Sequence, residues 1–504
     1  MNQALGTLQT IREFAGSRQT VGLDDATIER FVDLDPSLAD AIADAGRIHT
    51  ALQTEYGELL AGDESEAAAF LQTDFVNFYP ANTVNPYISM AAAGPWIVTS
   101  HGAVLHDNGG YGMLGAGHSP RAIMDIMGDT HVMANVMTPN FTHKRFATLL
   151  KAEVGQTRGS CPFSKFICMN SGSESVTVAF RIADVNAKHH TDPSGPRAGA
   201  TIKILSLSGS FHGRTDRPAQ ASDSCLGKYK THLASHAANN NLITVPPNDV
   251  ESLRKAFAQA EADGVFIELM LIEPVMGEGD PGLACTREFY DTARALTKAH
   301  GSLLLVDSIQ AGLRGSGYLS IIDYPGFQTA EEPDLETYSK ALNAGQYPLS
   351  VLACNERAAS LYVRGIYGNT MTTNPRALAV GCAVLEGLTP ELRTNIQDRG
   401  QDFLDGLNAL MEEMPELVLK VQGTGLLFSA ELHPAIEVVG FEGIETWLRK
   451  NGLGVIHGGE NSLRFTPHFA ITKAEVDLII HLVREAILVF SSLVTDASAQ
   501  AASK

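Results

Sequence analysis

The chain has 504 residues, which is long enough for a large hydrophobic core and for more than one structural domain. Hydrophobic residues make up 44%, too many for a disordered protein, and a formal net charge of −20 without a basic run argues against nucleic acid as a partner. The six cysteines are scattered, without a CxxC pair or a histidine at ligand spacing, so we interpret them as apolar side chains and expect no metal site.

The first 130 residues fall into two segments of different composition. The start, MNQALGTLQTIREF, lacks a basic region followed by an apolar stretch, so no signal peptide is indicated and a cytoplasmic protein is expected. Residues 1–75 are rich in Ala, Glu and Asp at helical spacing, which predicts an N-terminal helical extension. Residues 76–130 gather aromatic, Asn, Pro and Gly residues, as in NFYPANTVNPY, and we expect them to form the N-terminal part of a small domain.

The remaining sequence predicts a large domain followed by the rest of the small one. Within residues 131–375, strand-like segments such as IKILSL, VFIELMLI and SLLLVD alternate with helix-like ones such as DVESLRKAFAQAEAD. This alternation predicts an α/β fold whose mainly parallel sheet is flanked by helices. Residues 376–504 predict a smaller α+β domain. Its last helix contains DLIIHLVREAILVFSSLV, in which charged residues interrupt the apolar run, so we expect a packing helix rather than a membrane span.

The small-residue turn in MNSGSES comes directly before a predicted helix. Ser171, Gly172 and Ser173 open that helix, and the free N–H groups and positive dipole end of a helix attract anions. The turn therefore has two interpretations. It can be a cradle for a phosphate group, or Ser171 can simply cap the helix, with Glu174 favouring the first turn.

Three further candidate groups follow predicted strands, and ligands of an open parallel sheet collect at the carboxyl ends of its strands. Phe211 in SFHGRT, with His212 beside it, can stack on a planar ligand or pack in the core. Asp307 ends SLLLVD, where it can hold a proton on a ring nitrogen or act as a helix cap or structural ion pair. Lys340 follows DLETY, where it is either a solvated lysine or an amine for Schiff-base chemistry.

These groups together match the requirements of one cofactor. A phosphate cradle, an aromatic plate, an acid for a ring nitrogen and an amine for an aldehyde are what pyridoxal 5′-phosphate (PLP) needs. The sequence therefore predicts a PLP site in which Lys340 forms the Schiff base and Asp307 faces the pyridine nitrogen.

In order and spacing, the motifs resemble those of the class III, fold-type I, PLP-dependent aminotransferases. The resemblance covers roughly residues 95–490 and rests on NSGSES, SFHGRT, IEPVMGEG, LLLVDSIQAGLRGSG, DLETYSKALNAGQYPLS, GNTMTTNPRALA and NSLRFTPH. It implies a fold-type I transferase with PLP as cofactor. It also implies a homodimer whose active sites are shared between the subunits.

The resemblance assigns roles to single residues. Lys340 would hold PLP and move the proton between the substrate Cα and the cofactor C4′, Asp307 would pair with the pyridine nitrogen, and Gln310 would approach the ring hydroxyl. The other cofactor-binding residues that it implies in the same subunit are Ser171, Gly172, Ser173, Phe211, His212 and Glu273.

Two residues match family positions that reach other partners. Thr370 matches the threonine that reaches the phosphate of the neighbouring subunit, and Arg464 matches the arginine that binds a substrate carboxylate. The chain departs from the family at Ser308, where Asp-Glu is usual, and at Thr372 and Thr373, where Gly-Gly is usual. These departures touch no core cofactor group, but they leave the substrate and the reaction outcome open.

The leading prediction is an aminotransferase that moves an amino group from an amino acid, ω-amino acid or amine to a 2-oxo acid by a ping-pong mechanism. An epimerase, aminomutase or decarboxylase of the same fold is an alternative, because the same electron sink serves all these reactions. A PLP-binding protein without turnover is a remote alternative. The expected partners are small molecules and a second copy of the chain, with neither nucleic acid nor membrane involved.

Overall fold

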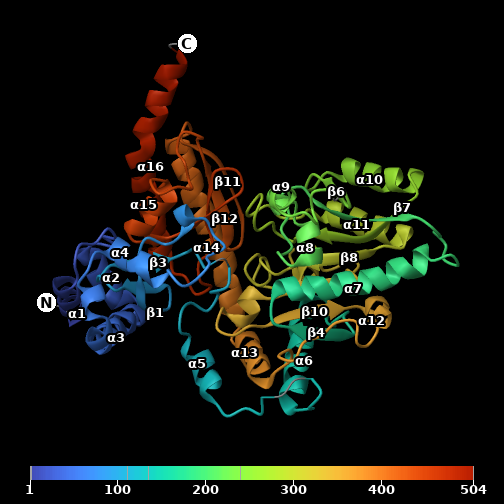
Figure 1. The fold of residues 1–504 in the computed structure, drawn as a ribbon, viewed down its shortest axis with the longest axis horizontal. Coiled ribbons are helices and arrows are strands. Elements are labelled where there is room, and N and C mark those ends of the chain that lie inside the picture. The colour runs from blue at the N-terminus through green and yellow to red at the C-terminus, as the bar shows by residue number, and fades with distance from the viewer. Residues whose placement is uncertain (1–2, 111, 134–135, 239, 503–504) are drawn as a thin grey trace. The chain divides into compact units, whose positions relative to one another are not determined.

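A computed structural model describes residues 3–110, 112–133, 136–238 and 240–502, with side chains in the last helix as far as Val494 (Figure 1). The chain forms two compact units. The larger unit comprises residues 122–397 and 423–427, and the smaller unit comprises residues 1–121, 398–422 and 428–504.

The larger unit is built on a seven-stranded sheet of order β4-β10-β9-β8-β7-β5-β6. Only β10 runs antiparallel to its neighbours, so the other strands all point the same way. The strands are β4 Lys165–Met169, β5 Thr201–Leu207, β6 Leu242–Val245, β7 Val265–Ile272, β8 Leu303–Asp307, β9 Leu335–Tyr338 and β10 Ser350–Cys354. The predicted α/β class, with a mainly parallel sheet flanked by helices, is confirmed.

Burial explains why these segments form strands. Every residue of β7 to β10 is buried, as expected for central strands that are covered on both faces. Val176, Phe180 and Ala183 of one helix pack with Leu269 and Leu305 of the sheet in a single apolar cluster. That helix, α7, lies along the sheet in Figure 1.

The helices of the larger unit connect its strands. They are α5 Arg121–Gly128, α6 Phe141–Glu153, α7 Gly172–Thr191, α8 Asp216–Ala221, α9 Asp223–His232, α10 Val250–Ala262, α11 Arg287–His300, α12 Glu356–Leu361 and α13 Pro375–Glu386, with short 3₁₀ turns η2 Gln156–Arg158, η3 Ile321–Asp323 and η4 Lys340–Asn343. Side-chain caps begin many of them; Thr286, for example, accepts a hydrogen bond from Phe289 N at the start of α11. Gly301, with φ 88°, ends the same helix in the left-handed conformation.

The smaller unit contains two four-stranded sheets, of order β1-β2-β3-β13 and β11-β12-β15-β14. Their strands are β1 Ser89–Ala93, β2 Trp96–Thr99, β3 Val104–Asp107, β11 Val418–Thr424, β12 Leu427–Leu432, β13 Leu453–Gly454, β14 Ile456–Gly458 and β15 Ser462–Phe465. The accompanying helices are α1 Gln3–Phe14, α2 Asp25–Leu34, α3 Pro36–Leu60, α4 Glu64–Leu71, η1 Ala81–Thr83, α15 Ile444–Lys450 and α16 Lys473–Ala502, and α14 Pro390–Glu413 contains a boundary between the two units.

The N-terminal helices are part of the core of the smaller unit. Leu8, Ile28 and Phe31 pack with Trp96 and Val98 in one buried cluster. The indole N–H of Trp96 also donates a hydrogen bond of 2.7 Å to Asp35, the residue between α2 and α3. Through the described part of the chain, no helix combines the length and apolar character needed to cross a bilayer.

Candidate active site

The predicted site residues of the larger unit gather at one edge of its sheet. Because β4, β5, β7, β8 and β9 point the same way, the segments that follow them emerge at the same edge. Asp307 ends β8 and is paired in register with Thr337 of β9, and Lys340 follows β9 after a single residue. The structure therefore brings the acid and the amine to the ends of adjacent parallel strands.

Asp307 is a buried carboxylate, 4% exposed, that three donors hold. The imidazole of His212 donates from Nδ1 over 2.8 Å, Thr337 Oγ1 over 3.1 Å and the backbone N–H of Ile309 over 3.2 Å. The side chain of His212 is itself fully buried. These donors offset the cost of burying the carboxylate.

Lys340 is half-buried and occupies a strained backbone position. Its φ of 45° lies in the left-handed region, which non-glycine residues rarely adopt and which is often found at functional sites. Its ammonium group donates a hydrogen bond to Oε1 of Gln310, which is buried at 8% exposure. The backbone thus directs this side chain toward the segment that follows β8.

Glu273 adds a second acid to this edge. It comes directly after β7, is 3% exposed, and accepts hydrogen bonds from the backbone N–H groups of Phe211 (3.1 Å) and Gly277 (3.0 Å). Burial raises the pKa of Glu273 to about 7, because it outweighs the opposing effect of His212. Near neutral pH this carboxyl group can therefore hold or release a proton.

The start of α7 combines both interpretations of the MNSGSES turn. Ser171 caps the helix in a capping box with Glu174, so the capping interpretation is realised. Within the described residues, the N–H groups of Gly172 and Ser173 still have no hydrogen-bond partner. A Cβ at position 172 would lie 2.6 Å from Cδ1 of Ile309, so a larger residue here would displace that side chain. The two N–H groups thus form a candidate anion cradle close to Ile309, whose backbone N–H donates to Asp307.

The ring of Phe211 is half-buried and already has a neighbour. The guanidinium of Arg214 lies 5.2 Å from its centroid, as in a cation–π contact. Stacking on a planar ligand would therefore use the other face of the ring. The sequence analysis did not single out Arg214, although it stands in the same SFHGRT motif.

These groups fit PLP on observations that do not depend on any bound molecule. Two buried polar atoms of this edge, Nε2 of His212 and Nε2 of Gln310, have no hydrogen-bond partner among the described residues. Buried polar atoms are normally paired, so unpaired ones point to a missing ligand or water. An acid, an amine, an anion cradle and unpaired buried polar atoms are the groups that the cofactor would engage.

Two predicted residues are placed differently. Thr370 is exposed, and its neighbour Asn369 contacts Asn170 and Glu174 of the same chain at 3.1 and 2.7 Å. Arg464 is buried in β15 of the smaller unit, where it is paired in register with Ser429.

Sequence reasoning missed two residues of β9 that support this edge. Thr337 donates to Asp307, and the buried Glu336 accepts a hydrogen bond from Ser308, the residue after Asp307. The signal was present, because an acid inside the strand segment DLETY is unusual in a fully buried strand. The rule that ligands collect at the carboxyl ends of strands does not select residues inside a strand.

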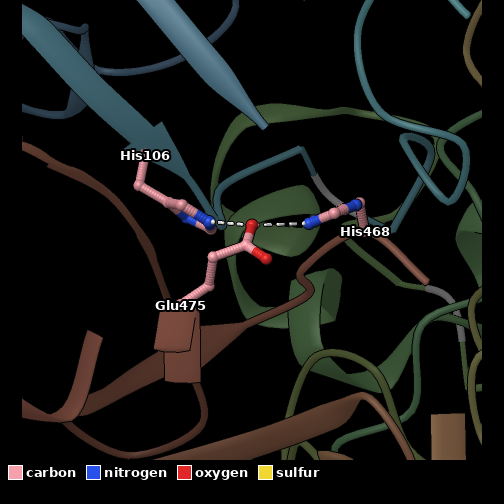
Figure 2. Close-up of side chains that lie close together, drawn as sticks. All are labelled: His106, His468 and Glu475. Atoms are coloured by element: carbon pink, nitrogen blue, oxygen red, sulfur yellow. Dashed lines mark hydrogen bonds and ion pairs between the residues drawn. The ribbon is translucent and has the colours of Figure 1, made fainter. Parts of the chain in front are cut away.

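The smaller unit contains a second cluster of titratable side chains, His106, His468 and Glu475 (Figure 2). Nε2 of each histidine lies 3.0 Å from Oε1 of Glu475, and Oε2 accepts bonds from N and Oγ1 of Thr472 at 2.7 and 2.6 Å. Burial opposes ionisation of Glu475, but the bonds from His106 and His468 outweigh it and hold its pKa well below the usual range. Its potential metal-ligating atoms are thus bonded to one another, and we interpret the cluster as structural.

The sequence is similar to a known protein family and to proteins of known function. The sequence model of a family described as "Aminotransferase class-III" matches residues 78–487. An acetylornithine aminotransferase from Thermosynechococcus vestitus is 31% identical over 325 residues, which cover 64% of this chain and 74% of the relative.

Solved structures resemble the chain at lower identity. An ornithine aminotransferase from Toxoplasma gondii superposes with a TM-score of 0.73 at 21% identity, over 87% of this chain and 99% of its own. A taurine:2-oxoglutarate aminotransferase from Bifidobacterium kashiwanohense, solved with PLP and glutamate, gives 0.69 at 16% identity, over 85% and 99%. At these identities the likeness concerns the fold.

Proposed function

The chain belongs to the class-III aminotransferase family and is a PLP-dependent transaminase, and on that premise we propose that the cluster around Asp307 and Lys340 is its active site. One observation carries the proposal. Asp307, held by His212, and Lys340, held by Gln310, lie at the ends of adjacent parallel strands beside an anion cradle. This arrangement gives one site both an electron-withdrawing partner for a ring nitrogen and a reactive amine.

Each residue would have a distinct task. When bound, PLP supplies an aldehyde that takes up the substrate amine and a ring that withdraws electrons from it. Lys340 would provide the amine that first holds the cofactor and then moves a proton at the substrate carbon. The hydrogen bond from His212 fixes the orientation of the Asp307 carboxylate, which would hold a proton on the ring nitrogen. Gly172 and Ser173 would bind the phosphate through their N–H groups.

The substrate class is proposed from the relatives and from one residue. Relatives of the chain are named acetylornithine and ornithine aminotransferases, so we propose an amino acid with a side-chain amine as donor and a 2-oxo acid as acceptor. The prediction that Arg464 binds a substrate carboxylate rests on the family motif SLRFTPH. A guanidinium suits that task because it can donate two parallel hydrogen bonds.

We also propose a homodimer. Exposed apolar side chains concentrate near the start of the larger unit, at Met124, Val132, Met133, Val136 and Phe141, and Met371 adds one beside Thr370. Apolar surface of this kind marks interaction sites in soluble proteins. The resemblance of GNTMTTNP to the family motif, whose threonine reaches the neighbouring subunit's phosphate, also supports the proposal. The cytoplasmic location stays a prediction.

Trapping at one lysine tests the site. The PLP-saturated protein is reduced with borohydride and digested, and we expect the pyridoxyl group on Lys340. The exposed Lys298, which is ion-paired with Glu331, serves as the internal control and should stay unlabelled. A label on another lysine, or none on Lys340, would refute the assignment. A panel of amino donors with pyruvate and 2-oxoglutarate then identifies the substrates.

Light scattering tests the dimer. Replacing Phe141, which is 95% exposed, by glutamate should shift the protein toward monomer, because a charge in an apolar interface must be desolvated. Phe441→Glu is the matched control, since Phe441 is an exposed phenylalanine of the smaller unit, at 66%. Equal masses for both variants would place the interface elsewhere.

A further inference from the structure

Glu336 is a carboxylate in the interior of the larger unit that the proposed chemistry does not use. It stands inside β9, is fully buried, and is paired in register with Val306 of β8. Charged residues are almost never fully buried unless their groups are satisfied by partners. The partners of Glu336 therefore indicate its task.

Four donors hold this carboxylate. Oε1 accepts from Ser308 Oγ at 2.6 Å and from the backbone N–H of Ile321 at 3.0 Å. Oε2 accepts from Ser320 Oγ and from Tyr338 OH, the latter at 2.9 Å. Burial raises the pKa of Glu336 to about 7, although these hydrogen bonds lower it. All four contacts donate to the carboxylate, so they favour its ionised form.

Three of the four donors come from the two ends of one loop. Ser308 begins the segment that follows β8, and Ser320 and Ile321 end it, so the carboxylate fastens residues 308–321 to β9 at both ends. A carboxylate suits this task because it accepts several bonds at once from different directions. Ser308 makes its contact possible, since its short hydroxyl reaches across from β8 to β9.

That loop carries Gln310, the partner of Lys340. Gln310 also lies close to Gly277, where an added Cβ would be 2.6 Å from Gln310 Cγ. Gln310 therefore contacts Lys340 and packs near Gly277, on a segment whose ends are fixed by Glu336. A displacement of this segment would move Gln310 away from the amine of Lys340. Small displacements at an active site lower the reaction rate by large factors.

We propose that Glu336 is a positioning residue for amino transfer, which fixes the loop 308–321 and thereby sets Gln310 against Lys340. The inference rests on the proposed active site. The proposal also gives a function to Ser308, which departs from the family pattern. Ser308, directly after β8, donates a hydrogen bond to Glu336 in β9.

Two substitutions test the anchor, with a matched control. Glu336→Leu removes all four hydrogen bonds to the carboxylate. Glu336→Gln keeps one oxygen as acceptor for Ser308 and Ile321, and its NH₂ group can donate to the hydroxyl groups of Ser320 and Tyr338. The control is Glu268→Gln in β7. Glu268 is also buried, at 2% exposure, and burial raises its pKa to about 7. It forms an ion pair with Arg217, which lies outside the loop.

The first readout is hydrogen exchange of the PLP-free protein. We expect the amides of residues 308–321 to exchange about tenfold faster in Glu336→Leu, with a smaller increase in Glu336→Gln and none in Glu268→Gln. Because this readout needs no cofactor and no turnover, it tests the anchor even if the proposed active site is wrong. An unchanged loop in both Glu336 variants would overturn the proposal.

The second readout is steady-state kinetics. We expect kcat to fall by about 10- to 100-fold in Glu336→Leu with little change in KM for the amino donor, and Glu336→Gln to recover part of the loss. A purely structural role would lower the amount of folded enzyme but leave kcat per folded site unchanged. If Glu336→Leu does not fold, Glu336→Gln decides: rates and exchange equal to those of Glu268→Gln would overturn the proposal.

Discussion

Both units bury a carboxylate beside histidines, and the hydrogen bonds of these histidines differ between the two clusters. In the smaller unit, the two oxygens of Glu475 are taken up by His106, His468 and Thr472. In the larger unit, Asp307 is held by His212, while Nε2 of that histidine has no partner among the described residues.

The difference separates a structural cluster from a functional one. A closed set of hydrogen bonds needs no ligand and stabilises the fold, whereas an open set is costly unless something binds to it. Glu273, at the same edge as Asp307, also differs from Glu475, because burial raises its pKa to about 7, whereas the pKa of Glu475 is lowered. Substitutions in the two clusters should therefore affect different properties, activity in one and stability in the other.

The largest effect is expected at Lys340. Lys340→Ala should lower kcat/KM by at least about a thousandfold, because the amine that holds the cofactor and moves the proton is gone. The melting temperature of the PLP-free protein should stay close to that of the wild type, because the side chain is only half-buried. Lys298→Ala is the control for lysine loss and should be fully active. An active Lys340→Ala variant would remove this lysine from the mechanism.

Asp307→Asn should have the next largest effect. The amide is neutral and cannot stabilise a proton on the ring nitrogen, so we expect kcat to fall about a hundredfold or more while PLP still binds. Stopped-flow measurement of the first half-reaction separates this step from product release. If the rate is unchanged, the carboxylate has no electronic role and the open cluster has another purpose.

Glu475 should give the opposite result. Glu475→Gln weakens the bonds to His106, His468 and the start of α16, and we expect a loss of about 2–3 kcal/mol in the free energy of unfolding. The kcat per folded molecule should not change. Denaturant titration and active-site titration on the same samples separate the two quantities. A variant of normal stability and low activity would show that the comparison assigns the two clusters wrongly.

The sequence predicted the edge of the sheet better than its interior. The ends of parallel strands meet at one edge, so residues that follow separate strands, such as Asp307 and Lys340, could be grouped without knowing the strand order. The contacts of Glu336 depend on the register of β8 and β9, and both strands are buried on both faces, so their apolar residues show no alternation that would indicate the register. The acid in DLETY was therefore visible as unusual, but its hydrogen-bond partners could not be predicted from the sequence.

The closed cluster was harder still to foresee. His106 and Glu475 are 369 positions apart, and each looks like an ordinary residue in its own segment. The amphipathic pattern of residues 1–75 likewise predicted helices, but it did not indicate that Phe31 packs against Trp96. Pairing between distant segments is decided by the tertiary fold, which a single sequence does not display.

The smallest effects are opposite pH dependences of stability in the PLP-free protein. In the unfolded chain Glu475 takes up a proton near its ordinary pKa of 4.5, whereas in the folded protein its pKa is lowered. Its contribution to stability is therefore present above pH 4.5 and is lost as the pH falls through the lowered pKa of the folded state. Glu273 has a folded pKa of about 7, so its contribution is complete below pH 4.5 and is lost as the pH rises through 7. Measured against the wild type by chemical denaturation, the deficit of Glu475→Gln should shrink in acid, whereas Glu273→Gln should gain relative stability between pH 4.5 and 7. Parallel curves for both variants would mean that the two carboxylates share one environment, and the distinction between a closed and an open cluster would fail.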